Sequence, residues 1–303
     1  MYNITRLYSD NLPKKKYNLR AFENIDNLHW GQRKLLLSEV EFLTNYYDSY
    51  DEGEKYLVYI GSAPGDHINY LSILFPEIKM ILYDSVKHVV KSNKNITIFE
   101  RYFTNDDAEN YKDMNIFMMS DIRGLDIKEH RKAQNETGKD VVIMYDMDYQ
   151  KKWYNIMKPK KALLKFRVSW NEQTTEYFDG DLYIQPWNGN DSVEMRLVPN
   201  GQTKIWNNKK IEEGLFYHNT ITRRTKLSNN DDNCIRFYYD NLAEILILTN
   251  YVKKFCRNTD INDDVEIKKR VCDISMSITL ELLKYHNTKI NDTYLKQIDR
   301  SLL

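Results

Sequence analysis

Cysteine and net charge are both scarce in this sequence of 303 residues. Its three cysteines, Cys234, Cys256 and Cys272, show neither metal-ligand spacing nor the even number of a disulfide framework, so we expect reduced thiols and an intracellular protein. Lysine plus arginine and aspartate plus glutamate each total 44, which excludes the overall basic surplus of a nonspecific nucleic-acid-binding protein. Any RNA-binding site must therefore be local.

Long apolar runs are also missing. The longest, around residues 245–248, is far shorter than the roughly 20 apolar residues that a membrane-spanning helix needs. The first residues, Met-Tyr-Asn-Ile-Thr-Arg, lack the apolar region of a secretory signal. We therefore expect a soluble protein without a membrane partner, and a hydrophobic content of 42% is enough for one large core.

The most informative segment is residues 58–65, Val-Tyr-Ile-Gly-Ser-Ala-Pro-Gly. An apolar strand that runs into a Gly-x-x-x-Gly turn and then into a helix is typical of a doubly wound α/β domain, at the point where such a domain binds a nucleotide-like cofactor. Gly61 and Gly65 allow a tight turn with close backbone approach, and Ile68 and Leu71 mark one face of the helix that follows.

The chemistry of this turn favours a cofactor without phosphate. The turn lacks the Gly-x-Gly-x-x-Gly spacing of dinucleotide enzymes, and Asp66 opens the next helix where a pyrophosphate needs a positive helix end. S-adenosylmethionine is such a cofactor, and Asp84, 19 residues after Gly65 at the end of strand 80–83, is placed to bind its ribose hydroxyls. Two alternatives stay open: a dehydrogenase-like enzyme that uses the same turn, and a solvated carboxylate at position 84.

Short apolar runs alternate with helical or polar segments along the chain, as in an α/β sheet. A helix through Leu36 and Tyr47 precedes the sheet, a long exposed loop is expected at 124–139, and two helices joined by a polar linker at 257–269 follow residue 241. The predicted strands lie at residues 57–60, 80–83, 96–99, 116–120, 162–168, 182–184 and 194–197.

Four charged residues, Lys34, Asp121, Lys165 and Glu194, lie at ends or interruptions of these predicted elements. Lys165 falls inside an apolar strand, where a lysine is costly unless it is paired or functional. Because an open α/β sheet gathers its site at the ends of its strands, we expect these side chains to form one site.

Around these residues the sequence resembles a known family, the poxvirus-type cap-specific mRNA (nucleoside-2′-O-)-methyltransferase, which also serves as the small regulatory subunit of the viral poly(A) polymerase. Five blocks carry the resemblance in the family's order and roughly its spacing: residues 30–37, 59–68, 120–123, 164–167 and 192–197.

The resemblance implies a Rossmann-like S-adenosylmethionine-dependent methyltransferase fold that acts on capped mRNA. It further implies a heterodimer with a poly(A) polymerase catalytic subunit, and a place in the host cytoplasm and the virion. We expect an N-terminal leader and helix packed on the core at 1–50, a methyltransferase core at 51–240 and a C-terminal helical extension of the same domain at 241–303.

The same resemblance implies a set of site residues, none of which binds a metal. The expected cofactor-binding residues are Gln32, Tyr59, Gly61, Gly65, Asp84, Phe103 and Asp121. The expected catalytic residues are Lys34, Asp121, Lys165 and Glu194. The expected cap- or RNA-binding residues are Tyr17, Arg167, Trp170, Glu172 and Glu212.

Methyl transfer to a ribose 2′-hydroxyl is an in-line displacement at a sulfonium carbon, so an enzyme must position the hydroxyl and remove its proton. A lysine acts as a base only when it is neutral, and its ordinary pKa is about 10.4. Burial or a second cation lowers the pKa of a lysine, whereas carboxylates raise it. We therefore assign Lys165 as the base or hydroxyl-orienting group, with Lys34, Asp121 and Glu194 aligning and tuning it.

Recognition of a cationic methylated guanine favours aromatic rings on both of its faces. Trp170 lies five residues after Lys165, as an aromatic residue does in the family, and Tyr17 is the second ring that we expect. The alternative is that Trp170 packs in the core. Arg167 is placed to hold a transcript phosphate.

Two departures from the family bear on the site. Where the family has Asp-Gly-Arg, this chain has Asp84-Ser85-Val86, so an arginine contact to the cofactor is missing or supplied elsewhere. The loop after Arg167 lacks the family's prolines, which leaves the shape of the cap pocket open. A second reading is therefore an RNA-binding poly(A) polymerase subunit with little or no methyltransferase activity, although the complete set of four charged residues favours an active enzyme.

Overall fold

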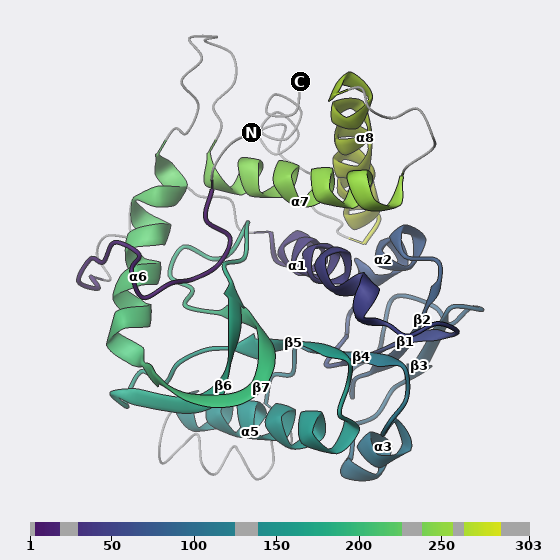
Figure 1. The fold of residues 1–303 in the computed structure, drawn as a ribbon, viewed down its shortest axis with the longest axis horizontal. Helices are drawn as coiled ribbons and strands as arrows, with labels where there is room; N and C mark the ends of the chain where they lie inside the picture. The colour runs from purple at the N-terminus through teal and green to yellow at the C-terminus, as the bar shows by residue number, and fades with distance from the viewer. Residues whose placement is uncertain (1–3, 19–29, 125–138, 226–237, 257–263, 286–303) are drawn as a thin grey trace.

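The computed structural model describes residues 4–18, 30–124, 139–225, 238–256 and 264–285 of the chain. These residues form one seven-stranded sheet in the order β3-β2-β1-β4-β5-β7-β6, with helices on both of its faces (Figure 1).

The first five strands run parallel and follow the Rossmann order, while β7 is antiparallel to β5 and β6 is antiparallel to β7. Helices cover both faces of the sheet at its central parallel strands. These strands are therefore apolar on both sides, and they coincide with the apolar runs of the sequence. The expected Rossmann-like α/β fold is confirmed. The strands are β1 (Lys55–Ile60), β2 (Ile78–Tyr83), β3 (Ile96–Phe99), β4 (Ile116–Ser120), β5 (Lys161–Phe166), β6 (Thr174–Tyr183) and β7 (Met195–Asn207).

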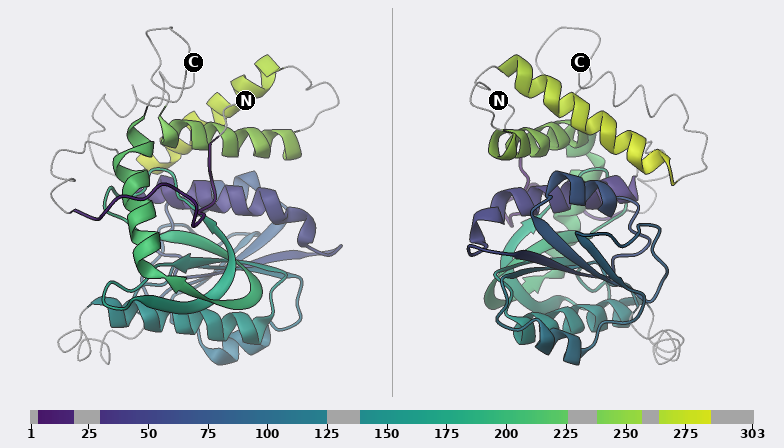
Figure 2. Two further views of the ribbon diagram at one scale, coloured as in Figure 1. Left: turned by 60° about the vertical axis from the view of Figure 1, so that its left-hand side comes forward. Right: turned by 90° about the vertical axis from the view of Figure 1, so that its right-hand side faces the viewer.

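Figures 1 and 2 show α1 and α2 on one face of the sheet, with α7 and α8 stacked over α1, and α3 and α5 on the opposite face. α6 stands beside the curled hairpin of β6 and β7. Because α1 lies between the sheet and α7, even its polar side chains Lys34 and Glu39 are buried. The helices are α1 (Gly31–Tyr46), α2 (Ile68–Leu74), α3 (Asn105–Asn110), α5 (Lys139–Met157), α6 (Asn208–Thr220), α7 (Tyr239–Phe255) and α8 (Asp264–Leu283).

The N-terminal segment lies along the edge of the sheet. Leu7 makes an isolated antiparallel bridge with Tyr183 of β6, and the amide of Tyr8 donates to the carbonyl of Leu182 at 2.7 Å. Arg6 is buried beside this bridge, where its guanidinium pairs with Glu41 of α1 at 2.7 Å. The segment thus ties the edge strand to α1.

The hairpin of β6 and β7 differs most from the sequence-based expectation. The expected strands 182–184 and 194–197 are the buried parts of a much longer antiparallel pair. The outer part of this pair is exposed and polar, so no alternation of apolar residues in the sequence predicts it. Glu194 lies just before β7 rather than in it. The expected linker at 257–269 is also wrong in part, because α8 begins at Asp264; its first seven residues lie outside the described part of the chain.

Other expectations fall partly outside the described residues. This holds for Cys234 and for nearly all of the loop expected at 124–139. Cys256 and Cys272 are half-buried at the two C-terminal helices. Among the helices that the structure describes, none is long and apolar enough to cross a membrane.

A buried ion pair joins α1 to α7 and α8. The guanidinium of Arg33 forms a bidentate pair with the carboxylate of Glu244, with Nε 2.9 Å from Oε2, and Ser275 Oγ donates to Oε1 of the same carboxylate at 2.6 Å. Trp187 Nε1 donates to Glu244 Oε2 at 2.8 Å, and Arg33 Nη1 donates to Thr279 Oγ1 at 3.0 Å. A buried charge pair with this many partners fixes the position of α1, which carries Gln32 and Lys34.

Candidate active site

A cavity of about 810 Å³ opens at the carboxyl ends of β1, β2 and β4, where the strand order of the sheet reverses. The turn after β1 forms one wall. Gly61 has a φ of +78°, and a Cβ at this position would lie 2.7 Å from the backbone nitrogen of Ile122. Only glycine therefore allows β1 to turn this closely past the end of β4.

Six of the seven expected cofactor-binding residues line this cavity. They come from α1, from the ends of β1, β2 and β4, and from the loop after β3. The six are Gln32, Tyr59, Gly61, Asp84, Phe103 and Asp121. Gly65 does not line the cavity; it has a φ of +74° and shapes the turn into α2, where its carbonyl accepts from the amide of Ile68.

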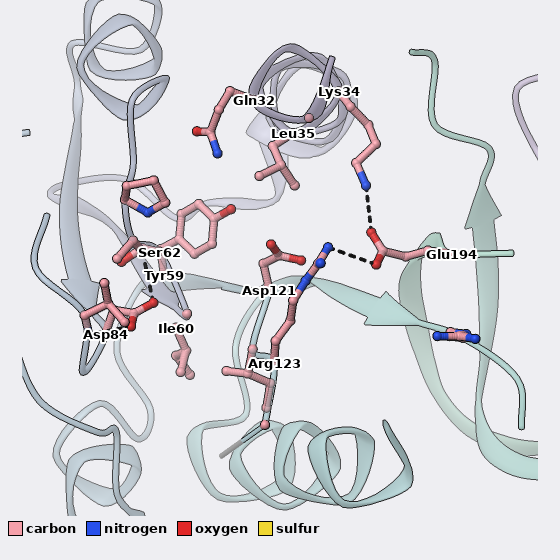
Figure 3. Close-up of a pocket in the computed structure, with 18 of the residues that line it drawn as sticks. Gln32, Lys34, Leu35, Tyr59, Ile60, Ser62, Asp84, Asp121, Arg123 and Glu194 are labelled. Carbon is pink, nitrogen blue, oxygen red and sulfur yellow. Dashed lines mark hydrogen bonds and ion pairs between the residues drawn. The ribbon is translucent and has the colours of Figure 1, made fainter. Parts of the chain in front are cut away.

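The expected catalytic residues meet at one end of the cavity, as Figure 3 shows for Lys34, Asp121 and Glu194. Lys34 Nζ lies 2.9 Å from Glu194 Oε1. Lys165 Nζ lies 3.0 Å from Asp121 Oδ1 and 3.4 Å from Glu194 Oε2. Lys34, Asp121 and Glu194 line the cavity, whereas Lys165 lies directly behind the two carboxylates and its Nζ is covered by its surroundings.

Arg196 is a fifth member of the cluster that the sequence analysis missed. Its Nη2 lies 2.7 Å from Asp121 Oδ1 and 3.3 Å from Glu194 Oε1, and the residue is buried. In the antiparallel register of β5 and β7, Arg196 faces Lys165 directly. A spacing of two along an extended chain places Glu194 and Arg196 on one side of it, and this signal was present in the sequence.

Burial and the surrounding charges set the ionisation of this cluster. Burial lowers the pKa of Lys34 from its ordinary value, although the charge of Glu194 opposes this. Burial would raise the pKa of Asp121, but the charges of Arg196 and Lys165 outweigh burial and hold that pKa at about 2. Lys34, Lys165 and Arg196 likewise outweigh burial and keep the pKa of Glu194 well below its usual range. Both carboxylates are therefore ionised at neutral pH.

The expected cap-binding residues divide into two groups. Tyr17, Arg167 and Trp170 line the same cavity, and Trp170 is 37% exposed, so it is not a core residue. Glu172 and Glu212 do not line the cavity; Glu172 is exposed, and Glu212 of α6 is close enough to Tyr17 to help raise the pKa of that phenol, after burial and Asp191.

Tyr17 and Trp170 do not form the expected parallel pair. Their ring centroids lie 5.6 Å apart at an interplanar angle of 63°, an edge-on contact. A base stacked between two rings needs them parallel and about 7 to 8 Å apart, twice a normal carbon contact distance. The guanidinium of Arg167 lies 5.2 Å from the centre of the Trp170 ring. A guanine that stacks on the Trp170 ring would therefore have to displace part of the Tyr17 ring or of the Arg167 guanidinium.

The departure from the family at position 86 has a structural counterpart. Val86 lines the cavity and is 60% exposed, and its amide donates to Asp84 Oδ1 at 2.8 Å. An apolar side chain therefore stands at the cavity rim beside the carboxylate.

Comparison with known proteins identifies the family. A family model described as poly A polymerase regulatory subunit matches residues 4–278. The cap-specific mRNA (nucleoside-2′-O-)-methyltransferase of Fowlpox virus (strain NVSL) is 33% identical over 216 residues, which cover 64% of this chain and 68% of that protein. The protein of the same name from Myxoma virus (strain Lausanne) is 28% identical over 220 residues, which cover 67% of this chain and 64% of that protein.

The chain therefore spans about two thirds of the length of these relatives. Among solved structures, it matches bluetongue virus VP4, described as a multifunctional RNA-capping production line, with 14% identity and a TM-score of 0.40 over 91% of this chain and 44% of that one. The family model covers most of the chain and confirms the resemblance seen in the five sequence blocks. The chain belongs to the poly A polymerase regulatory subunit family.

Proposed function

We propose that this protein is an S-adenosylmethionine-dependent methyltransferase that acts on the ribose 2′-hydroxyl of the cap-proximal nucleotide of mRNA. One observation carries the proposal: a single cavity joins the glycine turn and Asp84 at one end to the charged cluster of Lys34, Asp121 and Glu194 at the other. The names of the fowlpox and myxoma relatives support it. A dinucleotide enzyme is disfavoured because Asp66 is buried where the turn enters α2.

The residues at the Asp84 end fit the adenosine part of the cofactor. Asp84 Oδ2 accepts from the amide of Ala63 at 3.0 Å, and Oδ1 accepts from Val86. A carboxylate has about four acceptor positions, so two remain for a pair of ribose hydroxyls. The absence of a side chain at Gly61 leaves the backbone of the turn open to close approach.

The charged cluster fits the reaction. S-adenosylmethionine supplies an electrophilic methyl group when it is bound. The residues at the Asp84 end would hold this cofactor, and the charged cluster would position the ribose 2′-hydroxyl that receives the methyl group and would take up the proton that this hydroxyl loses. In this proposal Lys165 orients the hydroxyl or takes its proton once substrate binding uncovers its Nζ, and Asp121 and Glu194 hold the Lys165 side chain in place.

The test is direct. Purified protein is incubated with methyl-labelled S-adenosylmethionine and short RNAs that carry a methylated cap or none, and the labelled nucleotide is then identified. We expect label on the 2′-oxygen of the first transcribed nucleotide of the capped RNA only. Label on a base, or equal label on uncapped RNA, would contradict the proposal.

Replacing Asp84 with alanine should weaken S-adenosylmethionine binding by about 1 to 2 kcal/mol, the scale of charge-assisted hydrogen bonds lost from the ribose. Calorimetric titration measures the affinity, and Glu52→Ala, at an exposed position outside the cavity, is the control. Unchanged affinity in Asp84→Ala would remove this residue from the cofactor site.

Replacing Trp170 with alanine should raise the concentration of capped RNA that gives half-maximal rate, because stacking on a base contributes about 1 to 3 kcal/mol. Cofactor affinity should not change. Tyr145→Ala, at an exposed ring outside the cavity lining, is the control. The effect should be larger for the methylated cap than for an unmethylated one, and an equal effect on both would assign Trp170 a structural role.

The family to which the chain belongs favours a second function, support of a poly(A) polymerase catalytic subunit. We propose that this function coexists with methylation, as a heterodimer in which the chain holds RNA. Co-purification with a catalytic subunit and a longer tail in its presence would support the heterodimer, and the same tail length with or without the chain would contradict it.

A further inference from the structure

His67 lies buried between two residues of α1. Its Nδ1 is 2.7 Å from Gln32 Oε1 and its Nε2 is 2.9 Å from Glu39 Oε1. His67 is 1% exposed and Glu39 is 2% exposed. The hydroxyl of Tyr59 donates to the same oxygen of Glu39 at 2.7 Å. Gln32, Tyr59 and His67 all line the cavity, whereas Glu39 lies behind them.

The charge of Glu39 has one candidate partner in this arrangement. Among the described residues, the ion pair with His67 is the one that Glu39 forms. Burial and the charge of Glu39 raise the pKa of Tyr59 well above its ordinary value, so the phenol stays neutral and only donates a hydrogen bond. Both ring nitrogens of His67 face oxygens, Gln32 Oε1 and Glu39 Oε1, and both can donate to them only in a doubly protonated imidazole.

The protonation of His67 decides which way the Gln32 amide points. An imidazolium donates from both nitrogens, so the Gln32 oxygen must face it and the Gln32 NH₂ must face the cavity. A neutral imidazole that donates to Glu39 would instead accept from the Gln32 NH₂, which would turn the amide oxygen into the cavity. Figure 3 shows the amide nitrogen of Gln32 on the side of the cavity.

We propose that Glu39 and His67 form a buried relay that keeps the NH₂ of Gln32 turned into the cavity as a donor for the carboxylate of the amino-acid part of S-adenosylmethionine. The proposal rests on the proposed function for the identity of the ligand. Gln32 is the contacting residue, and Glu39 and His67 are positioning residues that act through it.

The relay is tested first in the protein without cofactor. Nitrogen-detected NMR of the histidine side chains distinguishes imidazolium from neutral imidazole, and His67→Gln assigns the signal among the six histidines of the chain. We expect both His67 nitrogens to carry protons in the wild type, and one to lose its proton in Glu39→Gln. A neutral His67 in the wild type would overturn the relay.

Ligand binding tests the direction of the amide. Gln32→Glu keeps an acceptor for His67 but removes the NH₂ donor, so S-adenosylmethionine binding should weaken about 10- to 100-fold. Glu39→Gln should weaken it less and in the same direction. Decarboxylated S-adenosylmethionine, which lacks the group that Gln32 is proposed to bind, should bind the wild type and both variants with similar affinity.

The two readouts separate this proposal from the proposed function. Equal weakening for both ligands in Gln32→Glu and Glu39→Gln would show that the residues are merely structural. A wild type that binds neither ligand would overturn the proposed function and the ligand named here, while the NMR spectrum would still decide whether the relay exists. Circular dichroism of each variant shows whether it is folded.

Discussion

Replacing Lys165 with alanine should abolish methyl transfer while leaving S-adenosylmethionine binding nearly unchanged. Placement of a proton-transfer group is worth about 10²- to 10⁴-fold in rate, and loss of alignment adds to this. The substitution also removes the cation that lies 3.0 Å from Asp121 and 3.4 Å from Glu194, while Arg196 and Lys34 still pair with these carboxylates. Cofactor affinity should persist because Gln32 and Asp84 line the cavity independently of Lys165.

Single-turnover methylation of capped RNA measures the rate, and calorimetry measures the cofactor affinity. Lys161→Ala, four residues earlier on the same strand, is the matched control because Lys161 lies outside the charged cluster. A Lys165→Ala variant that keeps more than about a tenth of the wild-type rate would refute the assigned role, since the expected loss is at least 100-fold. If a polymerase partner is found, its poly(A) extension should continue with the variant.

The parallel half of the sheet and its turn could be predicted from the sequence because their physical demands are local. Strand 57–60 is buried on both sides and strand 80–83 is buried except for the half-buried Ile81, so both show as apolar runs. The turn needs residues that tolerate a positive φ, so Gly61 and Gly65 mark it directly. Asp84 could be placed in the site because it directly follows the strand 80–83.

Other features depend on partners far away in the sequence. In the sequence, Arg6 looks like part of a polar leader. The structure shows that it pairs with Glu41 and that its segment lies along a sheet edge. In the sequence, Arg196 looks like an ordinary strand residue. Only the antiparallel register of the structure shows that it lies opposite Lys165. His67 follows the glycine turn, but nothing in the local sequence shows that Gln32 and Glu39 of another helix lie on its two sides.

The cap-binding prediction depends on the relative orientation of two rings, which the sequence does not specify. The exposure of Trp170 and its place on the cavity agree with a role in binding, but the angle between its ring and that of Tyr17 depends on how the N-terminal segment lies across the molecule. A sequence pattern specifies that an aromatic residue is present and leaves its orientation open.

Breaking the buried pair of Arg33 and Glu244 by removing one partner should destabilise the protein strongly. Neither α7 nor α8 lines the cavity in the described part of the chain, yet both hold α1, in which Arg33 stands between Gln32 and Lys34. Replacing Glu244 with alanine leaves a fully buried guanidinium without its counter-charge, and Trp187 Nε1 loses its acceptor. We expect the free energy of unfolding to fall by about 3 to 5 kcal/mol.

Urea unfolding followed by circular dichroism measures this loss, and two variants test its cause. Glu266→Ala breaks the half-exposed pair with Arg270 on α8 and should cost less than about 1 kcal/mol. The double variant Arg33→Met with Glu244→Leu removes both charges together and should recover most of the stability, because the large loss comes from an uncompensated charge rather than from a missing attraction. A double variant no more stable than Glu244→Ala would assign the loss to packing. In that case the C-terminal helices would hold α1 through their apolar contacts, and not through this ion pair.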